Sequence, residues 1–138
     1  EEEVAVVAPV SVKLCKLGEL CCEAIARFVG GNPQPEQLAE TLGIDQRVKL
    51  DHCKDHIQWA GERLTVWRFS AVGRKGRAAL GALGDYFVAK QRIGLVETAS
   101  YALYIVPPDE GYLEALGMPP SGYALGLQVP LTVPGEVQ

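Results

Sequence analysis

Alternation of apolar and polar residues marks the strands of this chain. Val10, Val12 and Leu14 alternate with Ser11 and Lys13, which predicts a strand over residues 10–15. A second alternation predicts a strand over 44–50, and three apolar runs predict buried strands over 64–69, 101–106 and 123–129. Residues 21–29 fit a helical stripe and a strand equally well, so the pattern leaves both open there.

Helix start and stop signals predict four helices, and in the third of them apolar residues also recur at helical spacing. They cover residues 36–42, closed by Gly43, then 51–59, 78–91 and 112–116. Asp51 is the expected N-cap of the second helix, and residues 73–77 form an expected basic loop before the third. Strands and helices are mixed without regular alternation, which indicates an α+β fold or a β-barrel with helices packed around it.

Length and composition indicate one globular domain. The chain has 138 residues, 48% of them hydrophobic and 22% charged. No apolar run approaches the roughly 18–20 residues that span a bilayer, so we expect no membrane contact. We expect the domain to cover 10–130, between a frayed segment 1–9 and a tail 131–138. Because the chain begins with Glu1, we expect it to be a piece of a longer protein.

The net charge of −4 is unevenly distributed. Residues 41–92 carry five acidic and ten basic residues, whereas the segments on either side are acidic. The net charge argues against bulk nucleic-acid binding, whereas the distribution indicates a local anion site, although a solvated basic face gives the same pattern. Arg74, Lys75 and Arg77 in the basic loop could instead contact RNA phosphates, which makes an RNA-binding or RNA-processing scaffold the alternative function.

The cysteines and histidines do not predict a metal centre or a catalytic site. Cys15, Cys21, Cys22 and Cys53 lack the paired spacing of a zinc site, and we expect free, buried or half-buried thiols in a reducing compartment. His52 and His56 flank Cys53 on a predicted helix but form no hydrolase pattern. We therefore expect no metal, no cofactor and no enzyme.

Three ordered segments carry a family resemblance. They are LGIDQRVKLD at 42–51, YFVAKQRIG at 86–94 and YALYIVPP at 101–108, preceded by the turn FVGG at 28–31. Together they resemble the SPOC domain, the Spen paralogue and orthologue C-terminal domain. The early Trp-x-Gly of many members is missing, and Gly43 stands where some animal members have a base. The short middle loops are more similar to plant-type members.

The resemblance implies a distorted seven-stranded β-barrel surrounded by short helices, in which residues 21–29 are a strand. It also implies a monomeric, nuclear adaptor that binds phosphoserine peptides. Implied partners are the phosphorylated C-terminal repeats of RNA polymerase II or an acidic phosphorylated cofactor of transcription or RNA processing. Other domains of the parent protein would contact RNA.

The spacing of the basic residues fits such a site. Arg47 and Lys49 lie two apart on a predicted strand, and Tyr86 and Lys90 lie four apart on a predicted helix, so each pair shares a face. If strand and helix meet, as the resemblance implies, an Arg fork, two ammonium groups and a hydroxyl would converge on one phosphate. Two further expected members are Lys16 and Arg92. Tyr101, Tyr104 and Tyr123 are expected in the core or half-buried beside it.

Overall fold

Eight strands and three helices make up residues 7–131, which the computed structural model describes. The strands are β1 (Val10–Lys16), β2 (Glu19–Gly31), β3 (Thr41–Ile44), β4 (Gln46–Val48), β5 (Thr65–Ala71), β6 (Ile93–Glu97), β7 (Tyr101–Val106) and β8 (Ala124–Pro130). The helices are α1 (Leu50–Ala60), α2 (Gly73–Lys90) and α3 (Glu110–Ala115), with a 3₁₀ turn at Gly61–Arg63. Residues 1–6 of the expected frayed segment and 132–138 of the expected tail lie outside the described residues.

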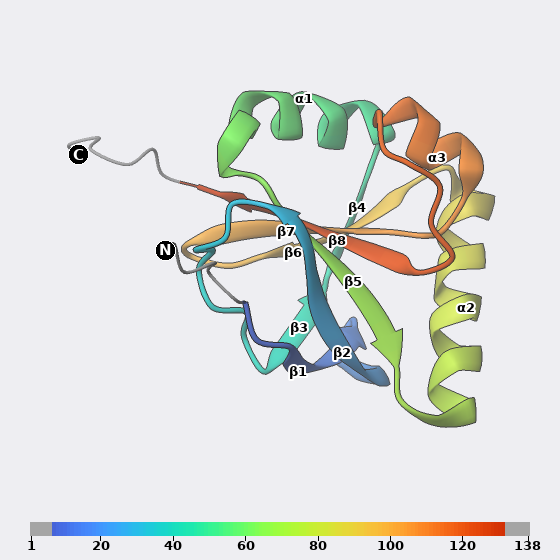
Figure 1. Ribbon diagram of the computed structural model, residues 1–138. Helices are drawn as coiled ribbons and strands as arrows, with labels where there is room; N and C mark the ends of the chain where they lie inside the picture. Colours follow the sequence, from blue (N-terminus) through green and yellow to red (C-terminus); the bar gives the residue numbers. More distant parts are fainter. Residues whose placement is uncertain (1–6, 132–138) are drawn as a thin grey trace.

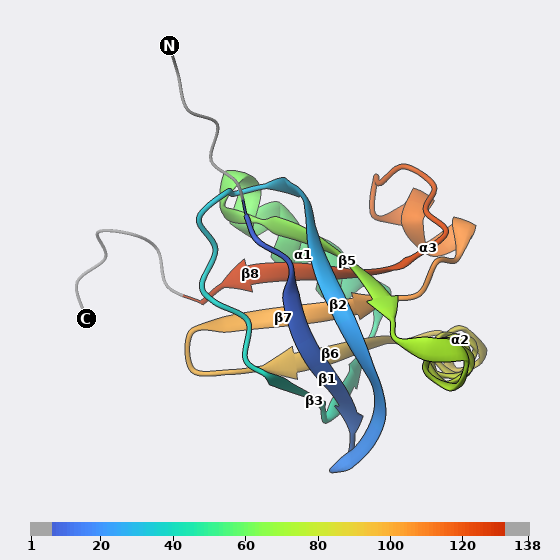
Figure 2. The ribbon, with the colours of Figure 1, turned by 60° about the horizontal axis from the view of Figure 1, so that its bottom comes forward.

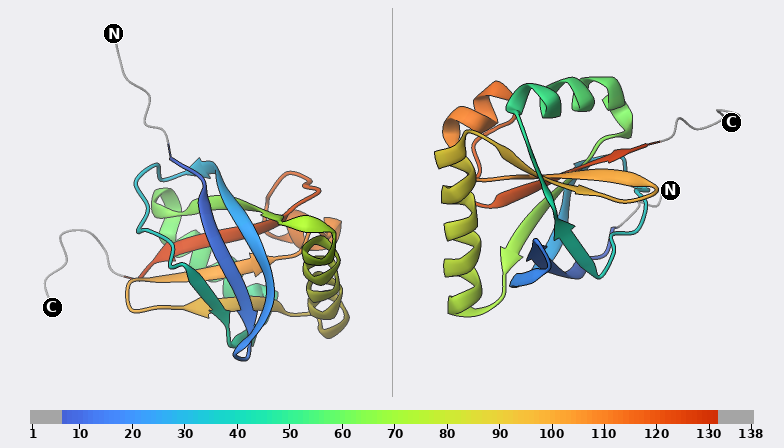
Figure 3. Two further views of the ribbon diagram at one scale, coloured as in Figure 1. Left: turned by 90° about the horizontal axis from the view of Figure 1, so that it is seen from below. Right: turned by 180° about the vertical axis from the view of Figure 1, so that it is seen from behind.

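All the strands belong to one sheet that curls into a nearly closed barrel. Its order is β3-β1-β2-β5-β8-β7-β6-β4, and each neighbouring pair is antiparallel except β1 and β3. The two edge strands, β3 and β4, are consecutive in the chain and separated only by Asp45. From behind they form one line of chain that crosses the barrel toward α1 (Figure 3, right). The edges of the sheet therefore meet, and β3 also contacts β6.

The barrel has eight strands in the described residues, one more than the resemblance implied. The strand expected over 44–50 is two strands, β3 and β4, which break at Asp45, and residues 49 and 50 belong to the start of α1. β6 was not predicted at all. Residues 21–29 are strand, as the resemblance implied, within the long β2 that crosses over β6, β7 and β8 with β1 (Figure 2).

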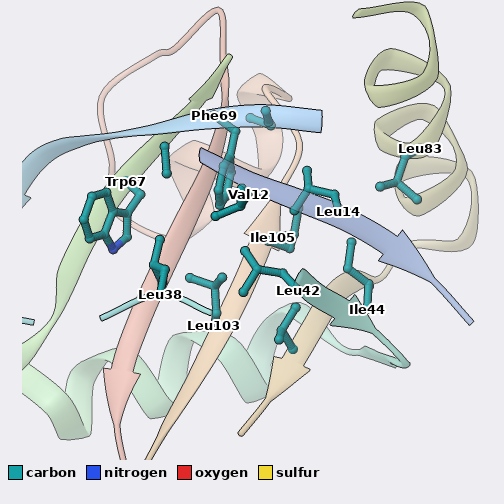
Figure 4. Close-up of a cluster of buried hydrophobic side chains, with 14 of the residues drawn as sticks. Val12, Leu14, Leu38, Leu42, Ile44, Trp67, Phe69, Leu83, Leu103 and Ile105 are labelled. Carbon is teal, nitrogen blue, oxygen red and sulfur yellow. The ribbon is translucent and has the colours of Figure 1, made fainter. Parts of the chain in front are cut away.

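Two layers of apolar side chains hold the barrel together. One fills the interior, where Val12, Leu14, Phe69, Leu103 and Ile105 converge (Figure 4). The other lies outside β6, β7 and β8 and is covered by α1 and α3 (Figure 1). All six residues of β7 are buried because its alternate side chains enter the two layers, and this explains its continuous apolar sequence.

Residues 36–42, expected to be a helix, are extended chain leading into β3. Side chains distant in sequence bind their backbone: the amide of Ala39 donates to the Tyr101 hydroxyl at 3.0 Å, and Gln128 Nε2 donates to the carbonyl of Glu36 at 2.7 Å. Gln128 Oε1 also accepts from the Trp67 indole at 2.7 Å. Leu38, which is 3% exposed, closes this end of the interior. These partners satisfy the backbone without a helix.

The helix starts also differ from expectation. α1 begins at Leu50 with Lys49 at its N-cap, so Asp51 lies in the first turn rather than at the cap. α2 begins at Gly73, so the expected basic loop 73–77 is the first turn and more of this helix. Packing of its apolar side, including the buried Leu83 and Phe87, stabilises the helix despite its uncapped, basic N-terminus. No helix within residues 7–131 is long and apolar enough to cross a membrane.

Of the three tyrosines expected in or beside the core, two are buried. Tyr101 and Tyr104 are at most 2% exposed, but the expectation for Tyr123 was wrong, because its side chain is 45% exposed. Tyr123 comes just before β8, and its ring lies outside the barrel beneath the guanidinium of Arg68.

Gly94 on β6 is required by a close approach of three elements. A Cβ atom there would lie 2.7 Å from Phe87 Cζ of α2 and 2.9 Å from Ile44 Cγ2 of β3. We expect Gly94→Ala to lower the free energy of unfolding by about 1–3 kcal/mol, the usual cost of overpacking a core. Urea unfolding measures this change.

The matched control is Gly81→Ala on α2, where an added Cβ atom meets nothing within 4 Å. It should leave the stability unchanged or raise it by up to about 1 kcal/mol, because alanine is the better helix former. Equal stabilities of Gly94→Ala and the wild type would contradict the close packing of α2 on β6.

Candidate functional site

A small polar pocket lies where β1, β4 and α2 meet. Its volume is about 220 Å³. Lys16 is the last residue of β1, Arg47 is the middle residue of β4, and Tyr86 is on α2. These three were expected site residues, and the structure brings them together. The complete lining is Lys16, Leu17, Ile44, Asp45, Gln46, Arg47, Tyr86 and Phe87.

Tyr86 holds both cations of this pocket. Arg47 Nη1 donates a hydrogen bond of 2.7 Å to the Tyr86 hydroxyl oxygen, and Lys16 Nζ lies 3.5 Å from the centroid of the Tyr86 ring. A cation over an aromatic face gains about 0.5–1 kcal/mol at an exposed site. Because the hydroxyl oxygen accepts from Arg47, its own hydrogen remains free to donate to an anion.

The local sequence explains this convergence. Leu17 and Gly18 both have positive φ, 51° and 85°, and form the tight turn from β1 to β2, which fixes Lys16 at the rim of the barrel. On the other side, Arg47 pairs with Gly94 across β4 and β6. Phe87 packs where Gly94 has no side chain, and this contact places the preceding residue, Tyr86, beside Arg47.

The other three expected residues lie outside the lining of this pocket. Lys49 is the N-cap of α1, and Lys90 is the last residue of α2, one helical turn beyond Tyr86. Arg92 directly precedes β6. The last register pair of β4 and β6 joins Val48 to Ile93, so one step further along the strands brings Lys49 toward Arg92. These three cations follow the surface from the pocket along the end of α2.

Asp45 is a pocket residue that the sequence reasoning missed. Its carboxylate lies beside Gly43, where a Cβ atom would be 3.4 Å from Oδ2. Asp45 is two residues before Arg47, and the spacing that linked Arg47 to Lys49 could have found it. Within the lining, one carboxylate therefore offsets one of two cations. The neighbouring Gln46 is already engaged, since its Nε2 donates to Glu97 Oε1 at 3.0 Å.

The thiols and histidines on α1 do not form a nucleophilic site. All four cysteines are free; Cys22 and Cys53 are buried, and Cys15 and Cys21 are half-buried, as expected. Burial raises the pKa of the Cys53 thiol to about 12, so it carries no thiolate at neutral pH. Nδ1 of His56 lies 2.7 Å from the Tyr104 hydroxyl. In the part of the chain that the structure describes, no three His, Cys, Asp or Glu side chains are grouped so that they could hold a metal ion.

The comparisons with known proteins identify the family of this chain. The SPOC domain family model matches residues 15–119, which include all six expected site residues. The chain belongs to the SPOC domain family. SPOC domains are protein-interaction modules rather than catalytic folds.

Among solved structures, the chain is similar to the crystal structure of the SPOC domain of human PHD-finger protein 3 (PHF3). The TM-score is 0.68 at 19% sequence identity, over 89% of this chain and 96% of that one. This likeness supports the SPOC fold. No curated protein matches the chain.

His56 should make the stability of this SPOC domain depend on pH. Burial, with a smaller contribution from nearby His52, lowers the pKa of His56 below its ordinary value of 6.5. The unfolded chain then binds more protons than the folded one as the pH falls below about 6.5, so the stability decreases in that direction. The Gln side chain in His56→Gln can still bond the Tyr104 hydroxyl but does not titrate.

Urea unfolding of both proteins between pH 7.5 and 5 measures this effect. The wild type should lose more stability than His56→Gln over this interval, in which the carboxylates contribute to both proteins alike. Parallel losses would contradict a lowered pKa of the half-buried His56.

Proposed function

We propose that this SPOC domain binds phosphoserine peptides and that Lys16, Arg47 and Tyr86 hold the phosphate. The observation that carries the proposal is the 2.7 Å hydrogen bond between Arg47 and Tyr86 beneath the ammonium group of Lys16. These two contacts bring the Arg47 guanidinium, the Tyr86 hydroxyl and the Lys16 ammonium group together at one opening. A phosphate group offers three strong acceptor oxygens and about −1.5 to −2 charges, which match these donors.

The charge of the pocket favours a doubly charged anion over a carboxylate. Asp45 offsets part of the positive charge of Lys16 and Arg47, so a weakly charged ligand gains little. A phosphate group has enough acceptor oxygens to accept hydrogen bonds from Lys16, Arg47 and the Tyr86 hydroxyl together. Arg47 is exposed, and we expect binding to weaken as salt is added.

Lys49, Lys90 and Arg92 complete the proposed site as contacts for the rest of the peptide. They extend from the pocket past the end of α2, on the side where β4 runs into α1. A peptide with acidic or phosphorylated residues beside its phosphoserine would follow them. The partners proposed from the family are the phosphorylated C-terminal repeats of RNA polymerase II or an acidic phosphorylated cofactor of transcription or RNA processing. The domain would then act in the nucleus as a non-enzymatic adaptor.

Replacing Arg47 tests the pocket. A hydrogen bond to a charged group contributes roughly 1.5–3 kcal/mol, so Arg47→Ala should weaken binding of a phosphoserine heptad-repeat peptide about ten- to a hundredfold. Calorimetry with matched serine and phosphoserine peptides measures both affinity and preference. Lys54→Ala is the control, because it removes one exposed cation from α1, away from the pocket lining.

Asp45→Asn is the matched variant, with the opposite expected effect on phosphopeptide affinity. It removes the negative charge of the pocket at nearly constant shape and should strengthen phosphopeptide binding several-fold, most at low salt. The proposal fails if wild type binds the serine and phosphoserine peptides equally or if Arg47→Ala retains the preference for phosphate. Tighter binding of single-stranded RNA than of the phosphopeptide at matched salt would favour the RNA-binding alternative.

A further inference from the structure

An apolar groove of about 270 Å³ lies on the other side of α2 from Tyr86. Gly81 and Gly84 line it, and at 3.6 residues per turn they are on the helix face opposite Tyr86. The groove and the phosphate pocket share Phe87 alone among their lining residues. Its other walls are the ends of β5 and β7 and the segment from α3 into β8, which passes beside α2 (Figure 1). Most of the lining is apolar: Phe69, Leu80, Leu83, Ile105, Pro107 and Ala124.

The packing of the fold does not account for the opening at Gly81. Gly84 is explained by the neighbouring strand end, since a Cβ atom there would lie 3.2 Å from Pro107 Cβ. At Gly81 a Cβ atom would meet nothing within 4 Å, and the same holds at Gly122 across the groove. Glycine is disfavoured in a helix interior, and no close contact in the described residues requires it at position 81.

The one charged residue among those that line the groove, Arg77, is a cation. The Arg68 guanidinium lies 4.7 Å from the centroid of the Tyr123 ring, which forms part of the rim. Arg68 is also directly opposite Arg27 in the register of β2 and β5, and like charges in that position repel. Its buried Nε has no hydrogen-bond partner among residues 7–131.

These observations define the chemistry of an occupant. The apolar lining suits a bulky aliphatic or aromatic side chain, and the cationic rim suits a carboxylate beside it. The volume is below the roughly 300–1,000 Å³ of pockets that enclose a drug-sized ligand, so it fits a side chain of a longer chain. An RNA segment would meet one lining cation and an apolar wall, which is a poor match for a phosphate backbone.

We propose that this groove is a second peptide-binding site, which takes a bulky apolar side chain next to an aspartate or glutamate from a partner protein. Binding here needs no phosphate and does not involve Arg47. One SPOC domain would thus hold two segments of a partner, or two partners, on opposite sides of α2.

Selection from a random heptapeptide phage library tests the proposal. The library is selected on the wild-type domain after depletion on Gly81→Leu, whose side chain would fill the groove and improve helix propensity. Circular dichroism confirms that the variant is folded. We expect the enriched peptides to share a bulky apolar residue adjacent to Asp or Glu. Arg77→Gln should weaken an enriched peptide about tenfold, whereas Gly81→Ala should weaken it less than Gly81→Leu.

Binding of the phosphoserine heptad peptide to Gly81→Leu separates the two sites. It should equal that of the wild type, whether or not the phosphate pocket is correctly assigned. The groove proposal is overturned if no peptide survives depletion, if the enriched peptides lack acidic residues, or if Arg77→Gln binds them as well as wild type does. Tighter binding of a uridine dodecamer than of any enriched peptide, abolished by Gly81→Leu, would overturn it in favour of RNA.

Discussion

The packing of Phe87 against Gly94 determines where α2 sits, and both candidate binding surfaces depend on that position. At this point α2, β3 and β6 come so close that a single added methyl group would be within 3 Å of side chains from both other elements. The contact lies where the edges of the sheet meet, so it also helps to close the barrel. With α2 fixed there, one side of the helix presents Tyr86 to Arg47 and Lys16, and the opposite side forms the wall of the apolar groove.

The pocket around Tyr86 gathers two cations in a chain of net charge −4, and the proposed preference for anions rests on them. Its cations are held in place by an aromatic ring and its hydroxyl rather than by carboxylates, which would neutralise them. Asp45 is the one carboxylate in the pocket lining. It lowers the positive charge of the pocket and takes no part in the hydrogen bond between Arg47 and Tyr86. The proposed preference for a phosphate over a single carboxylate would rest on charge and on the number of acceptors.

Local patterns predicted the elements that carry a clear signal in their own sequence. β7 was predicted with its observed bounds because all six of its residues are apolar. α1 was predicted over 51–59 from Asp51 as its N-cap, which placed each end within one residue although the cap is Lys49. The failures occurred where distant side chains decide the structure. Residues 36–42 are extended because Tyr101 and Gln128 bind their backbone, and the glycines of 73–77 are helical because the rest of α2 packs on the barrel. β6 is only five residues long, and its pairing with β4 and β7 is not visible in the local sequence.

The candidate site was only partly predictable, because its lining also depends on how distant elements pack. Spacing and the family resemblance together placed Arg47 near Tyr86, but spacing alone could not exclude Lys49 and Lys90 from the pocket lining or include Asp45. For Lys49, the outcome depends on where the elements end: β4 ends at Val48, and α1 begins at Leu50 with Lys49 as its N-cap.

The central claim is that Arg47 and Tyr86 bind phosphate as one unit, and a double-mutant cycle on phosphoserine-peptide affinity tests it most directly. The cycle uses Arg47→Ala, Tyr86→Phe and the double variant, all measured by calorimetry at the same salt concentration. Because the two side chains are joined by a 2.7 Å hydrogen bond, we predict a coupling free energy above about 0.5 kcal/mol, with the double variant hardly weaker than Arg47→Ala. Strictly additive effects, or no effect of either substitution, would contradict the claim.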